Sequence, residues 1–152
     1  MIKATLADKA IIFDLYDELI KSQAKLEPDF YQEATQGMNF IEDMINNEDS
    51  DILIVLEQEQ IVGFSVIKEM TAPSYPMFRP KEYAYIYDLV VRESARKKGF
   101  GKALLQSSVG WMKERELEYL ELAVLDNNKD GKSLYENFGF RSFSKQMIYK
   151  EN

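Results

Sequence analysis

The spacing of apolar residues changes along the chain, and the changes separate helices from strands. From Lys9 to Lys25 apolar residues recur at helical spacing, so we expect a helix there, with Asp8 able to cap it. A second helix is predicted over residues 34–47. Its apolar face would be formed by Phe40, Ile41, Met44 and Ile45.

After residue 50 the spacing indicates strands. Residues 51–57 form a continuous apolar run, which is typical of a strand buried on both faces. A short polar turn leads into a second strand over 61–70. Residues 82–92 carry the strongest strand pattern of the chain, and residues 1–6 are expected to add a short edge strand.

The second half of the chain alternates between the two periods. A helix is predicted from Gly101 to Glu116, a strand over 118–125, a short helix over 131–137, and a final strand ending near Tyr149. The core stripe of the longer helix would be Leu104, Leu105, Val109 and Met112. The order β-α-α-β-β-β-α-β-α-β predicts an α/β chain with a mixed sheet, and the absence of linkers and repeats predicts one domain over 1–152.

Composition narrows the chemistry. The 152 residues include no cysteine and no histidine, which excludes disulfides, thiolate nucleophiles and the commonest general base, so no metal site is expected. The net charge of -7 disfavours a nucleic-acid partner. No apolar run approaches the roughly 20 residues of a membrane helix, and the N-terminus lacks an apolar signal core. We expect a cytoplasmic protein without a membrane partner.

A basic, glycine-containing turn follows the strongest strand and opens a predicted helix. Three consecutive cations, two glycines and the unpaired N–H groups of a helix N-terminus all favour a phosphate or pyrophosphate. The alternative is a solvated basic turn whose glycines serve geometry alone. Neither a Walker loop nor a dinucleotide fingerprint fits the spacing. The predicted binding residues here are Arg96, Lys97, Lys98, Gly99, Phe100, Gly101 and Lys102.

Two blocks of the chain resemble the GCN5-related N-acetyltransferases (GNAT). Arg96, Gly99 and Gly101 match that family's motif A, Gln/Arg-x-x-Gly-x-Gly/Ala. A later block follows the family pattern Val-x₃-Asn-x₂-Ala-x₂-Leu-Tyr-x₃-Gly-Phe, with Gly131 standing where alanine is usual. Its matching residues are Val124, Asn128, Leu134, Tyr135, Gly139 and Phe140.

The resemblance implies a GNAT-like fold, a mostly antiparallel mixed sheet flanked by about four helices. It also implies direct attack of a primary amine, on a small cation or a protein, on the thioester of acetyl-CoA, the donor substrate. The pantetheine arm would run beside Leu89, Val90 and Val91 and pair with backbone groups of the first and last. Asn128 would hydrogen-bond the cofactor, cap the last helix, or do both. A non-catalytic acyl-CoA-binding module is the alternative function.

The resemblance also suggests roles in catalysis. Tyr135 would donate to the leaving thiolate, or else pack as an aromatic residue under the final strand. A backbone N–H near Leu89 or Val90 would stabilise the oxyanion. The resemblance does not settle the base. From its place among apolar residues Asp88 is a candidate base, directly or through water, or a structural carboxylate, and Glu82 and the tyrosines at 83, 85 and 87 are other candidates. Alternation puts Tyr83, Tyr85 and Tyr87 on the strand face opposite Asp88, as packing or as the lining of an acceptor pocket.

Two further features bear on partners. The region of the first two helices is rich in Asp and Glu, which would favour a cationic amine or would be an ordinary acidic surface. The segment from Pro73 to Pro80 carries Tyr75, Met77 and Phe78 and would form an apolar flap over the site or a homodimer contact.

Overall fold

A five-stranded sheet forms the centre of the computed structural model, which describes residues 1–35 and 37–151. The strand order is β1-β2-β3-β4-β5, antiparallel throughout except for the parallel pair β4 and β5. The strands are β1 (Ile2–Lys3), β2 (Ser50–Glu57), β3 (Gln60–Thr71), β4 (Glu82–Val91) and β5 (Leu120–Leu122). The expected mixed, mostly antiparallel sheet is confirmed.

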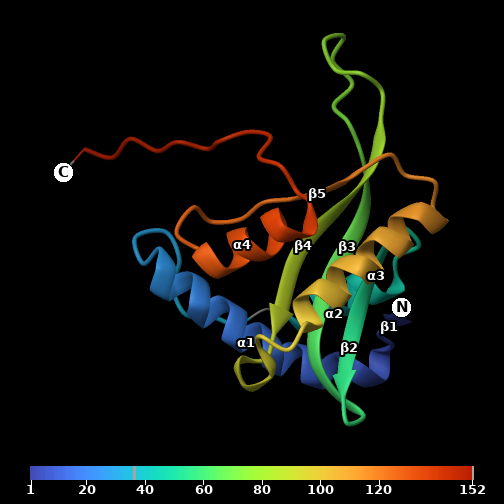
Figure 1. Ribbon diagram of the computed structural model, residues 1–152, viewed down its shortest axis with the longest axis vertical. Coiled ribbons are helices and arrows are strands. Elements are labelled where there is room, and N and C mark those ends of the chain that lie inside the picture. The colour runs from blue at the N-terminus through green and yellow to red at the C-terminus, as the bar shows by residue number, and fades with distance from the viewer. Residues whose placement is uncertain (36, 152) are drawn as a thin grey trace.

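Helices cover both faces of this sheet (Figure 1). They are α1 (Lys9–Leu26), α2 (Met38–Asn46), α3 (Phe100–Glu114) and α4 (Lys129–Phe138), with 3-10 turns at Leu6–Asp8 and Glu93–Ala95. One core cluster lies between α1, α2 and the sheet, and the other lies between the sheet, α3 and α4. The molecule therefore has three layers, and the α/β fold class is confirmed.

The buried stripe of α3 differs from the predicted one. Ser108 and Trp111 are fully buried, whereas Val109 and Met112 are only half-buried. The Ser108 hydroxyl donates to the carbonyl of Leu104 at 2.9 Å, so the polar side chain is satisfied inside the core. A hydrophobicity pattern assigns this serine to the solvent-exposed face. The predicted buried stripe is therefore displaced by part of a turn from the observed one.

Two details at the N-terminal ends of the helices also differ. The second helix was predicted over residues 34–47, but Gly37 is extended and α2 begins only at Met38. Residue 36 of the predicted range lies outside the described residues. Asp8 occupies the N-cap position of α1 without a side-chain cap. Its carboxylate instead accepts from the N–H of Thr5 at 2.8 Å, within the preceding 3-10 turn.

The predicted final strand is wrong within the described residues. Residues 141–151 form no strand, and in Figure 1 they leave the body beyond α4. Phe143, Met147 and Tyr149 are 78%, 85% and 87% exposed. The alternating apolar residues favour a strand, but a strand also needs a partner edge, and this segment lies against none in the single chain.

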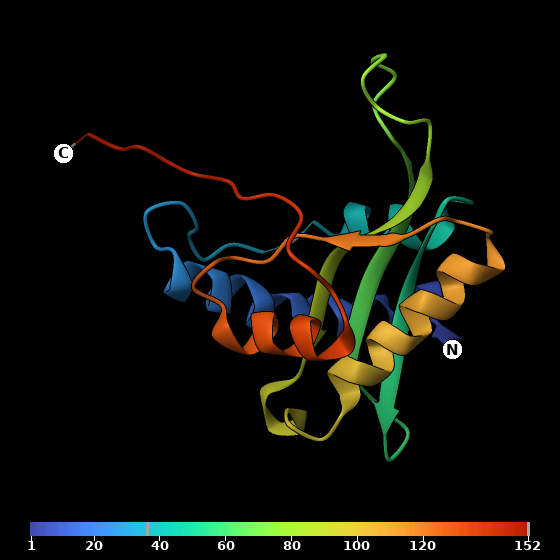
Figure 2. The same ribbon diagram turned by 45° about the horizontal axis from the view of Figure 1, so that its top comes forward.

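The β3–β4 hairpin extends well past the rest of the sheet (Figure 2). At its tip Tyr75 and Met77 are 70% and 83% exposed. The tip lies at the end of β4 opposite to the start of α3, so it does not cover the basic turn (Figure 1). Among the described residues, no helix combines the length and apolar character needed to cross a membrane.

Candidate active site

A β-bulge at Tyr87 changes the face of the sheet toward which the following side chains of β4 point. Tyr87 lies between Ile86 and Asp88, which pair with consecutive residues of β3. Ile86 packs in the core beneath α3, whereas Val90 packs in the core beneath α1. The bulge therefore turns Asp88 toward α1, onto the same face as Tyr85. The prediction that Asp88 lies opposite the tyrosines is wrong, because strict alternation holds only along an uninterrupted ladder.

The same bulge frees backbone groups on the other edge of β4. The N–H of Arg92 donates to the carbonyl of Val62 at 2.7 Å, so by alternation the backbone groups of Leu89 and Val91 point away from β3. Pairing between β4 and β5 ends at Ile86. β5 itself ends at Leu122, the partner of Ile86, so beyond this point Leu89 and Val91 face a gap at the edge of β4 that no strand of the described chain fills. An extended ligand could pair with them there.

The basic turn joins β4 to α3 through two left-handed residues. Lys97 has φ 60° and Gly99, the N-cap of α3, has φ 90°. A Cβ at Gly99 would meet no atom within 4 Å, so backbone conformation rather than space explains the glycine here. The turn is exposed, and the first N–H groups of α3 have no partner within the helix.

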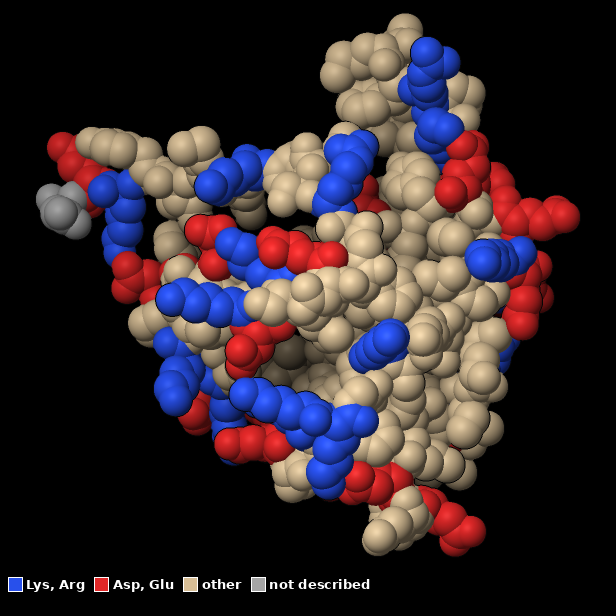
Figure 3. Space-filling view, in the orientation of Figure 1, with Lys and Arg blue, Asp and Glu red and all other residues tan. Residues whose placement is uncertain are grey.

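The three cations of the turn are held differently. Arg96 donates from Nε to the carbonyl of Val91 at 3.0 Å, which fastens the turn to the end of β4. Lys98 pairs with Glu57 at 3.2 Å. In the described part of the chain Lys97 has no ion pair, and its side chain is exposed. Figure 3 shows Lys and Arg side chains along the lower rim of a hollow on this face.

Gly101 has a packing role in addition to the expected one. A Cβ at this position would lie 2.9 Å from Cδ2 of Leu134 on α4. The glycine therefore lets α3 and α4 pack closely, beyond any access it gives to an anion. Lys102 lines a small hollow of about 130 Å³ beside Leu134 and Phe138.

Asn128 caps α4. Its Oδ1 accepts from the N–H of Gly131 at 2.9 Å. A Cβ at Gly131 would lie 2.6 Å from Nδ2 of Asn128, so glycine rather than the family's usual alanine allows this close approach. The capping role is confirmed. Within the described residues Nδ2 has no hydrogen-bond partner and can still donate to a ligand.

Asp88 is held by a residue that the sequence did not single out for the site. The hydroxyl of Tyr16, in the core of α1, donates to Oδ2 of Asp88 at 2.7 Å. Burial raises the pKa of Asp88, and the hydrogen bond from Tyr16 partly offsets that rise. A buried tyrosine on a helix stripe needs a polar partner, which is the signal that could have pointed to Tyr16.

Tyr135 of α4 belongs to the same site. It is half-buried and packs edge-on against Phe140, with ring centroids 5.9 Å apart. Burial raises the pKa of the Tyr135 phenol, and the charge of Asp88 raises it further. The two catalytic candidates therefore interact electrostatically, although Asp88 is bonded to α1 and Tyr135 belongs to α4, which lies on the other face of the sheet. The phenol stays protonated and can donate.

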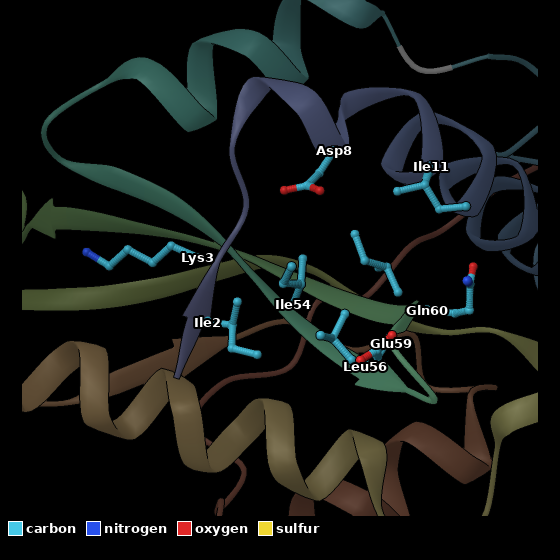
Figure 4. A pocket seen from close by; sticks show the side chains of 9 residues that line it. Ile2, Lys3, Asp8, Ile11, Ile54, Leu56, Glu59 and Gln60 are labelled. Carbon is cyan, nitrogen blue, oxygen red and sulfur yellow. The ribbon is translucent and has the colours of Figure 1, made fainter.

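A second hollow lies far from this gap. It has a volume of about 460 Å³ and is bounded by β1, the start of α1 and the β2–β3 turn (Figure 4). Aliphatic side chains such as Ile54 and Leu56 form much of its wall. Neither Asp88 nor Tyr135 reaches it, so we place the candidate active site at the open edge of β4.

The chain is similar to known acetyltransferases. A family profile described as the acetyltransferase (GNAT) family matches residues 13–140. The uncharacterized N-acetyltransferase YhfO of Bacillus subtilis (strain 168) is 31% identical over 118 residues, 74% of each chain. L-ornithine N5-acetyltransferase NATA1 of Arabidopsis thaliana is 36% identical over 76 residues, which cover 50% of this chain and 33% of NATA1. The crystal structure of a mutant of BH1408 from Bacillus halodurans matches with a TM-score of 0.93 at 25% identity, over 100% of both chains.

Proposed function

Because the chain belongs to the acetyltransferase (GNAT) family and is an acyl-CoA-dependent N-acetyltransferase, we propose that it acetylates a primary amine by direct attack on the thioester of acetyl-CoA. The observation that carries this proposal is the bulge at Tyr87. It brings a carboxylate, a free backbone edge and the start of the strand gap to one place. A module that only binds acyl-CoA would need the backbone edge and the gap, but not the carboxylate beside them.

The donor would be held at the end of β4. The exposed turn from Arg96 to Gly101 offers N–H groups and positive charge to the pyrophosphate. The outward-facing carbonyl of Leu89 and N–H of Val91 would pair with the pantetheine amides, and Nδ2 of Asn128 would add a hydrogen bond. These residues leave the thioester end beside Asp88.

Three groups would then share the chemistry. Asp88 takes a proton from the attacking ammonium, and its raised pKa makes it a better base than an ordinary carboxylate. The N–H of Leu89, which points into the gap, stabilises the developing oxyanion; that of Val90 points toward β3. Tyr135 hydrogen-bonds the leaving thiolate. Its raised pKa favours a shared proton over complete transfer to a thiol whose own pKa is near 8.5.

The acceptor would be a cationic primary amine. The chain carries a net charge of -7, and NATA1 is named for acetylating an amino acid with a distal amine. Small cations and protein amines both stay within this proposal. A cytoplasmic location and the absence of nucleic-acid and membrane partners stay predictions from the sequence.

Thiol release tests this function. Acetyl-CoA should liberate coenzyme A only when an amine is present, and the acetylated amine should appear in equal amount. A panel of amines without any release above the uncatalysed rate, together with tight acetyl-CoA binding, would favour the non-catalytic module instead.

The proposal includes a homodimer formed through the C-terminal segment. The outer edge of β5 pairs with no further strand in the described chain, and β5 is only three residues long. Residues 141–151 are exposed and carry alternating apolar side chains. A second copy offers both a strand and an edge, so each tail would extend the sheet of its partner.

Deleting residues 141–152 should convert the dimer to a monomer, as measured by size-exclusion chromatography with light scattering. Lys150→Ala provides the control, because it removes one charge of the tail and the ion pair that joins the tail to Asp29 at 3.3 Å in the single chain, but none of the apolar side chains, and should leave the dimer intact. A wild-type monomer, or a dimer that survives the deletion, would contradict the strand exchange.

A further inference from the structure

Four tyrosines form an open aromatic surface on the β4–β5 part of the sheet, on the face away from α3 and α4. The rings of Tyr83 and Tyr119 are stacked, with centroids 4.8 Å apart and planes 5° apart. Tyr85 and Tyr87 meet edge to face at 5.1 Å. All four side chains keep contact with solvent. We call these four residues the tyrosine face.

One carboxylate lies on this surface. Glu121 of β5 is the register partner of Tyr85 on β4, so the two side chains share a face. Its charge contributes to the raised pKa of Tyr83, Tyr85 and Tyr119, after the larger effect of burial. In the part of the chain that the structure describes, the backbone of Glu121 pairs with β4, but no ion pair or hydrogen bond involves its carboxylate. The carboxylate therefore lies among aromatic rings without a cation to balance it.

This combination suits an organic ammonium. The π faces of tyrosine attract cations, and a neighbouring carboxylate adds the direct charge attraction. A phosphate or carboxylate ligand would instead be repelled by Glu121. The chemistry on this surface thus selects a positively charged group with an alkyl body that can pack on the rings.

The tyrosine face leads directly to the candidate active site. Asp88 shares its face, and its charge also acts on Tyr85. Because of the bulge, Tyr85 and Asp88 pair with Lys68 and Val66, which lie only two positions apart on β3. At about 3.3 Å per residue along the strand and about 4.8 Å between β4 and β5, the backbone positions of Asp88 and Glu121 are roughly 8 Å apart. A single linear molecule could place one nitrogen at each carboxylate.

We propose that Glu121 and the tyrosine face bind a second cationic group of the acceptor, and that the acceptor is a linear diamine or polyamine. This inference rests on the proposed acetyl transfer at Asp88 and narrows its acceptor. The distal ammonium lies at Glu121 and the alkyl chain lies along Tyr85 and Tyr87. The reacting amine then reaches Asp88, where it loses its proton and attacks the thioester.

The test compares two amines of equal chain length, octylamine and diaminooctane, by thiol release from acetyl-CoA. The diamine should have a kcat/KM about tenfold higher, chiefly through KM, since one charge-assisted contact is gained. Glu121→Gln should reduce the ratio of the two kcat/KM values to near one. Glu114→Gln, which removes the same charge from the exposed surface of α3, should leave the ratio unchanged.

Each outcome separates the two proposals. Thiol release with both amines at equal kcat/KM, or a diamine preference that survives Glu121→Gln, would overturn the diamine inference and leave acetyl transfer standing. A ratio that falls equally in Glu114→Gln would also overturn it, because overall charge would then explain the preference. No release with either amine, together with release by another member of the amine panel, would overturn the diamine inference alone. Failure of the whole panel would overturn acetyl transfer as well.

Discussion

Replacing Tyr135 by phenylalanine should lower kcat about a hundredfold while changing the Kd for coenzyme A less than about twofold. In the proposed mechanism the phenol donates to the leaving thiolate, a contact that forms only as the thioester breaks. Phenylalanine keeps the ring that packs against Phe140 at 5.9 Å, so folding should be preserved. Steady-state kinetics and calorimetric titration with coenzyme A measure the two quantities.

Tyr75→Phe is the matched control for this experiment. It removes the same hydroxyl from the exposed hairpin tip, far from the turn that begins α3, and should leave kcat at the wild-type value. An unchanged kcat in Tyr135→Phe would assign Tyr135 a packing role only. A large loss of coenzyme A affinity would make it a binding residue rather than a catalytic one.

Replacing Asp88 by asparagine should have opposite effects on activity and stability. Loss of the base should lower kcat/KM about a hundredfold. The melting temperature at neutral pH should rise, because burial raises the pKa of Asp88 and the wild-type protein must keep an unfavourable charge there. Asparagine keeps an oxygen that can accept from the hydroxyl of Tyr16.

The sign of the pH dependence follows from the raised pKa. Between the ordinary carboxyl pKa and the raised folded value, the folded chain holds a proton that the unfolded chain has released. Stability due to Asp88 is therefore present below the unfolded pKa and is lost as pH rises through the folded pKa. The stability advantage of Asp88→Asn should accordingly vanish in acid, and thermal melts across pH measure it.

Tyr16→Phe offers an independent check on the same group. Removing the donor at 2.7 Å should raise the pKa of Asp88 further, because that hydrogen bond favours the charged carboxylate. The acidic limb of the kcat/KM profile should move to higher pH. An unmoved limb would mean that another group, or water, is the base.

The sequence predicted most of what depends on local pattern. The helix from Lys9 needs only its own apolar spacing, and the turn at Arg96 needs only its charges, its glycines and the helix that follows. Tyr135 and Asn128 were singled out through a spaced motif; Asn128 caps α4, and the pKa of Tyr135 responds to the charge of Asp88.

What the sequence missed depends on pairing between distant segments. The bulge arises because two consecutive residues of β3 pair with Asp88 and Ile86 and leave Tyr87 between them unpaired. No property of residues 82–91 alone requires this pairing. The bond between Tyr16 and Asp88 joins positions 72 apart. The segment beyond Phe140 has the apolar alternation of a strand. Whether it forms one depends on a free strand edge elsewhere, which its own sequence does not reveal.

Direct titration with acetyl-CoA tests the central claim that the turn from Arg96 to Gly101 and the open edge of β4 bind this donor. In a thermal shift experiment acetyl-CoA at about 100 times its Kd should stabilise the protein by about 2.7 kcal/mol. Coenzyme A should act similarly, whereas ATP and NAD at equal concentration should act far more weakly. Absence of stabilisation by any coenzyme A species, or equal stabilisation by ATP, would contradict the account.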